Sequence, residues 1–242
     1  MQRRLGSRHL PGSATIGTMS VPSRVEAAAL LRSFDPPPWF LRHSRAVAEI
    51  AAWLAARASA GGHRVDRSVV EAAALLHDID KLLDPSDPAR HLPHGDGSAA
   101  WLDAAGHPEL APAVAAHPVV RLGHGNGAEA WLARATLEER IVAYADKRAG
   151  QRLEPVDARF ASWERRYPPL PRTSPSTPEE RAGAGWDQAT LGLVRGRVAR
   201  LERDVCSIAG TRPEHVRRLA WTGAALRAGP TGRGPAGRAP HS

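Results

Sequence analysis

Apolar residues recur at helical spacing along most of the chain. Between residues 39 and 60, His43, Val47, Ile50 and Leu54 follow one another at steps of four, three and four, which places them on one face of a helix. No stretch alternates apolar and polar residues as a half-buried strand does. The pattern therefore predicts an all-α protein. The other helices that it predicts cover residues 21–33, 66–83, 98–105, 108–117, 136–150, 155–167 and 178–210.

Stretches rich in proline, glycine or arginine divide the chain. The predicted parts are a disordered leader (1–20), a main helical domain (21–167), a stiff Pro-rich connection (168–177), a C-terminal helical extension (178–221) and a disordered basic tail (222–242). The extension carries an apolar stripe from Leu191 to Ile208 at steps of three and four. This stripe suits packing on the main domain or on a second copy in a homodimer.

Composition is that of an ordinary globular protein, with 42% apolar and 24% charged residues. The net charge of +8 suggests nucleic acid or anionic membranes as partners. However, residues 1–20 and 222–242 each hold three arginines and no acid, which leaves only +2 for the rest. Nucleic acid is therefore not an expected partner of the folded body.

Several classes of protein are excluded. No run approaches the ~18 apolar residues of a membrane helix, and Pro11 and Gly12 interrupt the N-terminal stretch where a secretory signal would need an apolar block. The expected location is the cytoplasm. Because Cys206 is the single cysteine, any metal must be bound by His, Asp or Glu.

Three polar features do not fit an apolar helix bundle. His43 lies on the apolar face of its helix, His77-Asp78 ends an apolar run, and Asp146 follows another. Each alone has an ordinary explanation, such as a hydrogen-bonded core histidine or a helix-end acid paired with Lys147. Imidazoles and carboxylates directed at one core from three helices indicate a divalent metal site, because buried acids need partners.

The sequence around these residues resembles the HD superfamily of metal-dependent phosphohydrolases, whose pattern is a His, a His-Asp pair and a distant Asp. The matching segments are LRHSRAVA (41–48), ALLHDIDK (74–81) and RIVAYADK (140–147). The resemblance covers roughly residues 39–150 and implies an HD-domain helical bundle. Asp80 departs from it, because the most similar subgroup usually has Gly or Ala there.

Dinuclear members of this family bind a second ion through two further histidines. His94 and His117 match those positions in order and context, although His91 competes with His94. The loop residues His63, His107 and His124 are expected to be solvated. The resemblance thus implies two ions bridged by Asp78, with the ligands His43, His77, Asp78, His94, His117 and Asp146.

These ligand types suit iron, manganese, cobalt, nickel or zinc, and two such ions activate water for attack on phosphorus. The expected activity is hydrolysis of a phosphoester or phosphoanhydride bond, by a phosphomonoesterase or phosphodiesterase, in a nucleotide or dinucleoside polyphosphate. Asp78 and Lys81 are the expected catalytic residues. The expected substrate contacts are Lys81 and, as weaker candidates, Arg45, Arg121 and Lys147.

Two other functions stay open at this point. A catalytically inactive or ligand-sensing HD protein with a regulatory or nucleic-acid-associated role is favoured by the basic ends, whereas the complete ligand set and Lys81 oppose it. An oxygenase is the other, because a few di-iron relatives in this superfamily oxidise their substrates.

Overall fold

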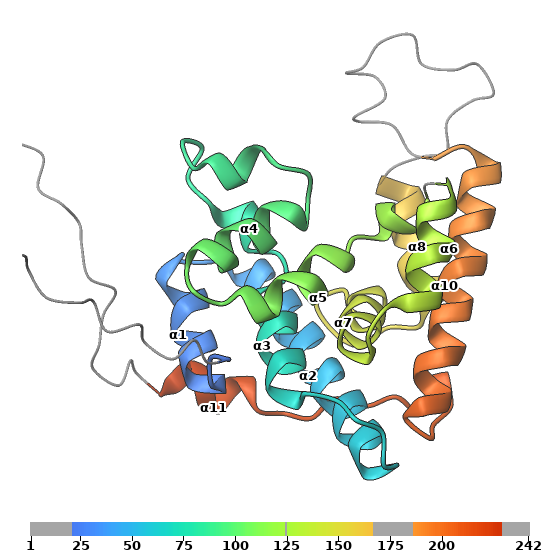
Figure 1. The fold of residues 1–242 in the computed structure, drawn as a ribbon, viewed down its shortest axis with the longest axis horizontal. Coiled ribbons are helices and arrows are strands. Elements are labelled where there is room, and N and C mark those ends of the chain that lie inside the picture. Colours follow the sequence, from blue (N-terminus) through green and yellow to red (C-terminus); the bar gives the residue numbers. More distant parts are fainter. Residues whose placement is uncertain (1–20, 124, 167–185, 229–242) are drawn as a thin grey trace, which may run out of the picture.

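Ten α-helices and no β-strand occur in the residues that the computed structural model describes, which are 21–123, 125–166 and 186–228 (Figure 1). The predicted all-α fold is confirmed. The helices are α1 (Arg24–Ser33), α2 (Pro38–Ala60), α3 (Arg67–Leu76), α4 (Asp96–Ala104), α5 (Ala111–Ala116), α6 (Gly125–Arg134), α7 (Leu137–Lys147), α8 (Val156–Arg166), α10 (Gln188–Ile208) and α11 (Thr222–Arg227). Short 3-10 helices connect them: η1 (Ile79–Leu82), η2 (Pro88–His91), η3 (Pro108–Leu110), η4 (Val119–Leu122) and η5 (Pro213–His215).

Helix α2 forms the centre of the bundle and packs against both α3 and α7 (Figure 1). Its predicted inward residues Val47, Ile50 and Leu54 are fully buried. Helices α3 and α7 begin at side-chain caps, because Asp66 accepts the N–H groups of Ser68 and Val69, and Thr136 accepts that of Glu139. These three helices therefore hold a fixed arrangement around one apolar core. None of the helices in the described part of the chain is long and apolar enough to cross a bilayer.

Helix α3 ends at Leu76, whereas the sequence pattern extends it to residue 83. The side chain of His77 causes the difference, because its Nδ1 donates to the carbonyl of Ala74, which would otherwise serve the next helical turn. Asp78 then leaves helical geometry and η1 follows. His77 and Asp78 consequently lie at the junction of α3 and η1 and not within a helix.

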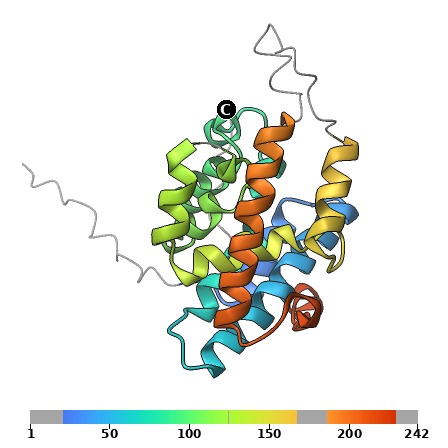
Figure 2. The ribbon, with the colours of Figure 1, turned by 90° about the vertical axis from the view of Figure 1, so that its right-hand side faces the viewer.

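Helix α10 packs along α7 within the same chain, and Figure 2 shows it running the length of the bundle. Leu191, Val194, Val198, Leu201 and Val205 of its predicted stripe are all buried. The stripe is thus covered by the main domain and is not free to pair with a second copy.

Residues 222–227 differ from the disordered tail that the sequence predicts for 222–242, because they form α11 beside α1. Ala225 and the preceding Trp221 join the apolar core, and polar contacts hold the start of this helix as well. Thr222 is buried and donates through Oγ1 to the buried carboxylate of Glu49 on α2. Arg218 donates to the other oxygen of this carboxylate, Oε2 of Glu49, at 2.6 and 3.0 Å. Such contacts between distant residues leave no periodic apolar signal in the sequence.

The remaining predicted segments lie outside the described residues. These are the leader, the Pro-rich connection, the helix start near residue 178, Tyr167, His124 and residues 229–242.

Arg218→Met should destabilise the protein, because the buried Glu49 carboxylate loses two charge-assisted hydrogen bonds. Arg218 is about one-third exposed, so we expect the lower part of the usual range, about 1–2 kcal/mol in the free energy of unfolding. Urea unfolding followed by circular dichroism measures it. Arg203→Met, at an exposed position of α10, is the control. Equal stability of the two variants would contradict this role of Glu49.

Candidate metal centre

Six polar side chains converge where α2, α3, α5 and α7 meet. His43 comes from the second turn of α2, and Asp146 lies in the last turn of α7. His77, Asp78 and His117 are almost completely buried, whereas the side chain of His94 is 35% exposed. The six are the predicted ligands: His43, His77, Asp78, His94, His117 and Asp146.

The first group consists of His43, His77 and Asp146. The Nε2 atom of His43 lies 3.2 Å from Nε2 of His77 and 3.4 Å from Oδ1 of Asp146. The Nε2 atom of His77 lies 3.7 Å from the same carboxylate oxygen. One ligand atom from each residue thus points at a common space.

The second group consists of Asp78, His94 and His117. The Nε2 atoms of His94 and His117 are 3.2 Å apart, and they lie 3.2 and 3.4 Å from Oδ1 of Asp78. The other oxygen of this carboxylate, Oδ2, lies 3.5 Å from Nε2 of both His43 and His77. Asp78 therefore stands between the two groups with one oxygen toward each.

The histidine rings are oriented through Nδ1. Main-chain carbonyls accept from three of them, those of Gly150, Ala74 and Val114, and Oδ2 of Asp80 accepts from His94. Because a carbonyl can only accept, Nδ1 carries the proton, and Nε2 of the neutral ring offers a lone pair. The Nε2 lone pairs of these rings face one another and the carboxylates of Asp78 and Asp146. Only protons or a cation can compensate the repulsion between such electron-rich groups. The donor set therefore fits divalent metal ions.

Burial and charge set the protonation of these groups. Burial lowers the pKa of His77 to about 3 and also lowers that of His117. Burial acts to raise the pKa of Asp78 and Asp146, but the interactions of Asp78 with the imidazoles around it and of Asp146 with Lys147 outweigh burial and hold both pKa values well below the usual range. These four groups are thus in the deprotonated form that binds metal.

His43 and His94 have raised pKa values. Burial acts to lower both pKa values, but it is outweighed by the hydrogen bonds that His43 donates to Asp146 and that His94 donates to Asp78 and Asp80. The pKa of His94 reaches about 9. A metal ion has to displace a proton at these two rings, as it does from most protein ligands.

The four basic residues predicted to contact substrate lie in different surroundings. The Nζ atom of Lys81 lies 2.7 Å from Oδ2 of Asp78, and its side chain is 45% exposed. Lys147 is fully buried, because its Nζ donates to Oδ2 of Asp146 at 2.9 Å and to the carbonyl of His117. It has no exposed surface for a substrate, so the prediction for Lys147 is wrong in this respect.

The two arginines also differ from each other. Arg45 donates to Thr222 at 3.1 Å and so contacts α11 instead of the six candidate ligands. Arg121 forms an ion pair with Asp96, the first residue of α4. Arg121 is therefore nearer to the role predicted for it, because it also lines a pocket that His94 lines.

Of the alternatives left open, His94 and not His91 lies among the candidate ligands. His91 is exposed on η2, and His63 is exposed as expected. Asp80, which was not among the predicted site residues, is buried and bonded to His94. Its position next to Ile79 and close to an apolar run is a sign of a required partner, as it is for Asp78.

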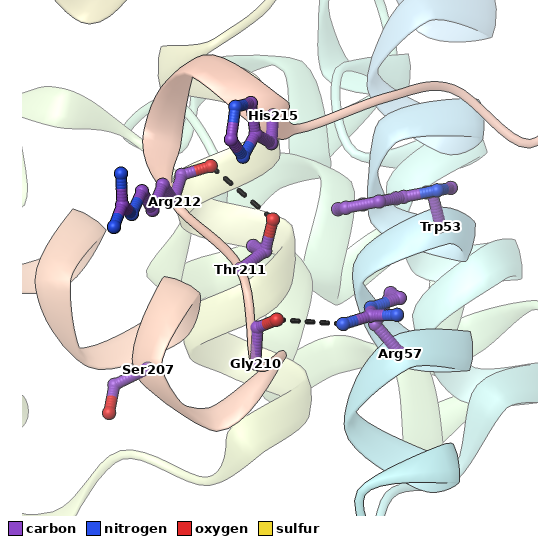
Figure 3. Close-up of a pocket in the computed structure, with 7 residues that line it drawn as sticks. All are labelled: Trp53, Arg57, Ser207, Gly210, Thr211, Arg212 and His215. Carbon is purple, nitrogen blue, oxygen red and sulfur yellow. Dashed lines mark hydrogen bonds between the residues drawn. The ribbon is translucent and has the colours of Figure 1, made fainter.

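Two pockets of similar size bear on the location of a substrate site. The first, of about 630 Å³, is bounded by the loop before α4, by α5, η4 and α6, and by the start of α7, and His94 lines it. The second, of about 580 Å³, lies between α2 and the residues that follow α10 (Figure 3). Trp53 and Arg57 line the second pocket, and none of the six candidate ligands does. The first pocket is thus the one that adjoins the metal-binding groups.

Comparison with known proteins places these observations in a family. Residues 40–150 match the family model of the HD domain, a range that contains all six candidate ligands. No curated protein and no solved structure matches the chain. The fold and the candidate ligand groups agree with this match, which identifies an HD domain in residues 40–150 of this chain.

Proposed function

We propose that this protein uses two divalent metal ions to hydrolyse a phosphoester or phosphoanhydride bond in a nucleotide or dinucleoside polyphosphate. The observation that carries the proposal is the position of Asp78, whose two oxygens face two separate pairs of imidazoles. A carboxylate in this position suits a bridge between two ions. The remaining ligands would be His43, His77 and Asp146 in the first group and His94 and His117 in the second.

Mixed imidazole and carboxylate ligands favour iron, manganese, cobalt, nickel or zinc over magnesium. When bound, two such ions supply an acidified water as nucleophile and positive charge for the phosphoryl oxygens. The chain then needs no serine or cysteine nucleophile. The single cysteine, Cys206, is buried against Tyr144.

Two lysines have separate tasks in this proposal. Lys81 keeps one N–H on Asp78 and has two more to offer, so its exposed ammonium can donate to a phosphate oxygen. Lys147 acts inside the protein, where it compensates the charge of Asp146 and ties it to the main chain of His117. Lys81 would thus contact the substrate, whereas Lys147 would hold Asp146 in position.

The first pocket supports a substrate with a flat apolar part. Its walls are mainly proline, alanine and valine side chains, with the indole of Trp131 among them. Glu139 fixes this indole, because its Oε2 accepts from Nε1 at 2.8 Å. A nucleobase can stack on such a ring while its phosphate reaches His94. We therefore place the base of the nucleotide in this pocket.

Metal content and turnover should separate the roles of Asp78 and Lys81. We expect Asp78→Ala to lose metal and activity together, because both groups lose a ligand. Lys81→Ala should keep its metal and lose about 10²-fold in rate, as for removal of one charged donor to the transition state. Protein purified without added metal is analysed by mass spectrometry and then assayed on nucleotides and dinucleotides with manganese. Full metal content in the wild type without turnover of any substrate would reject the proposed hydrolase activity.

His117→Ala should reduce the metal content from two ions per chain to one, because the second group loses one of its three residues while the first stays complete. The same metal analysis, on variants loaded with manganese and freed of excess, measures the ratio. His91→Ala removes an exposed histidine next to this loop and should keep two ions. Two ions in the His117 variant would reject His117 as a ligand of the second ion.

Trp131→Ala should raise the KM for a nucleotide about 10-fold, because one base–aromatic stacking contact is lost. Tripolyphosphate has no base, so its KM should hardly change. The matched control is Trp53→Ala, in the second pocket (Figure 3), which should affect neither substrate. An equal rise in KM for both substrates would show that Trp131 does not contact a base.

A further inference from the structure

Asp80 bonds to the most exposed of the four histidines. Its Oδ2 lies 2.7 Å from Nδ1 of His94 and accepts the backbone N–H of Gly95 at 3.0 Å. We propose that Asp80 is a positioning residue, which holds the His94 ring with Nε2 toward Asp78 and His117 and so sets the metal affinity of the second group. The inference rests on the proposed function only in requiring that this group binds a metal ion.

His94 needs a tether that the other three histidines have from their own surroundings. His77 and His117 each bond to the carbonyl three residues earlier, at the end of a helix. His94 lies in the loop between η2 and α4, and its side chain is 35% exposed. Without a fixed partner at Nδ1, this ring would be free to turn toward water. Within residues 21–123, 125–166 and 186–228, Asp80 is the only carboxylate that bonds to an Nδ1 of the four candidate histidine ligands.

Asp80 is itself held rigidly. Its backbone N–H donates to the buried hydroxyl of Ser98 at 2.9 Å, and its carbonyl accepts from Arg90 at 2.8 Å. Gly97 packs against it so closely that an added Cβ would lie 3.1 Å from the Cβ of Asp80 and 2.4 Å from the carbonyl oxygen of Ala89. The carboxylate is therefore in place before any metal binds.

The loop that carries His94 is fixed at its other side as well. Gly95 has a φ of +87°, and a Cβ at this position would lie 2.6 Å from Cγ of Pro118, the residue after His117. The close approach brings the His94 loop against the end of α5. Both histidines of the second group are thus held in register, and Asp80 fixes the remaining freedom, which is the rotation of the His94 ring.

Asp80 does not fit the role of a direct ligand beside His94. Asp78, Asp80 and His94 offer oxygen and nitrogen atoms within 4.8 Å of one another. However, Asp80 meets the Nδ1 edge of the ring, whereas Asp78 and His117 meet the Nε2 edge. One ion cannot lie at both edges. The arrangement is instead that of a carboxylate behind a ligating histidine, which orients the ring and makes it a stronger donor.

The negative charge of Asp80 adds to its effect on the metal affinity of the second group. The Oδ1 atom of Asp80 is buried and has no hydrogen-bond partner among the described residues. The negative charge of this carboxylate is therefore shared mainly with His94 and Gly95. The first group has no comparable acid behind its histidines, which bond to main-chain carbonyls. Loss of the Asp80 charge should consequently weaken the second group alone.

Cobalt binding tests the proposal without reference to turnover. Metal-free wild type and the variants Asp80→Ala and Asp80→Asn are titrated with Co²⁺, and the visible absorption bands and the heat of binding are followed. We expect two ions in the wild type. In Asp80→Ala one of the two should bind about 10- to 100-fold more weakly, with a changed spectrum for that ion. Asp80→Asn should recover part of the loss, because its amide oxygen can still accept from Nδ1.

Asp84→Ala removes an exposed acid of the same segment and should leave both affinities unchanged. The proposal is overturned if Asp80→Ala weakens both ions equally, if it weakens neither, if Asp80→Asn binds no better than Asp80→Ala, or if the wild type binds fewer than two ions. Two Co²⁺ ions with the expected loss, but no hydrolysis of any nucleotide, would reject the proposed function and leave the role of Asp80 standing.

Discussion

The buried carboxylate of Asp78 is the constraint on which the rest of the site depends. A charge at this depth is costly unless partners surround it, and each of its oxygens faces two imidazoles from different segments. The apolar bundle fixes those segments, so the rings cannot turn away to water. The need of one buried acid for polar partners thus accounts for the convergence of four histidines. Lys147 likewise compensates the charge of Asp146.

Periodicity and spacing were sufficient to predict much of this structure. His43 falls on the apolar face of a long helix, and Asp146 ends an apolar run behind the N-cap Thr136. Both positions follow from helical repeats and caps, which are local properties. His94 and His117 could be identified only through likeness to a family, because a loop histidine and a helix-end histidine carry no distinctive local pattern.

The features that the sequence did not predict depend on particular side-chain contacts, some of them local and some between distant residues. Helix α3 stops early because the side chain of His77 takes a backbone carbonyl. Helix α11 has a patternless sequence, and it is held by Glu49, which lies on α2. Lys147 was expected to contact substrate, yet it is fully buried between two candidate ligands. Helical periodicity and capping signals do not register such pairings.

The two candidate ligand groups differ in how much of the chain must fold before they exist. The second group draws on residues 78–117, whereas the first needs residues 43–146 to be brought together. An ion in the first group therefore closes a loop of about a hundred residues, and any ligand bound only by the folded form raises its stability by mass action. Metal supply would then govern how long the bundle survives unfolding and proteolysis, in addition to its chemistry.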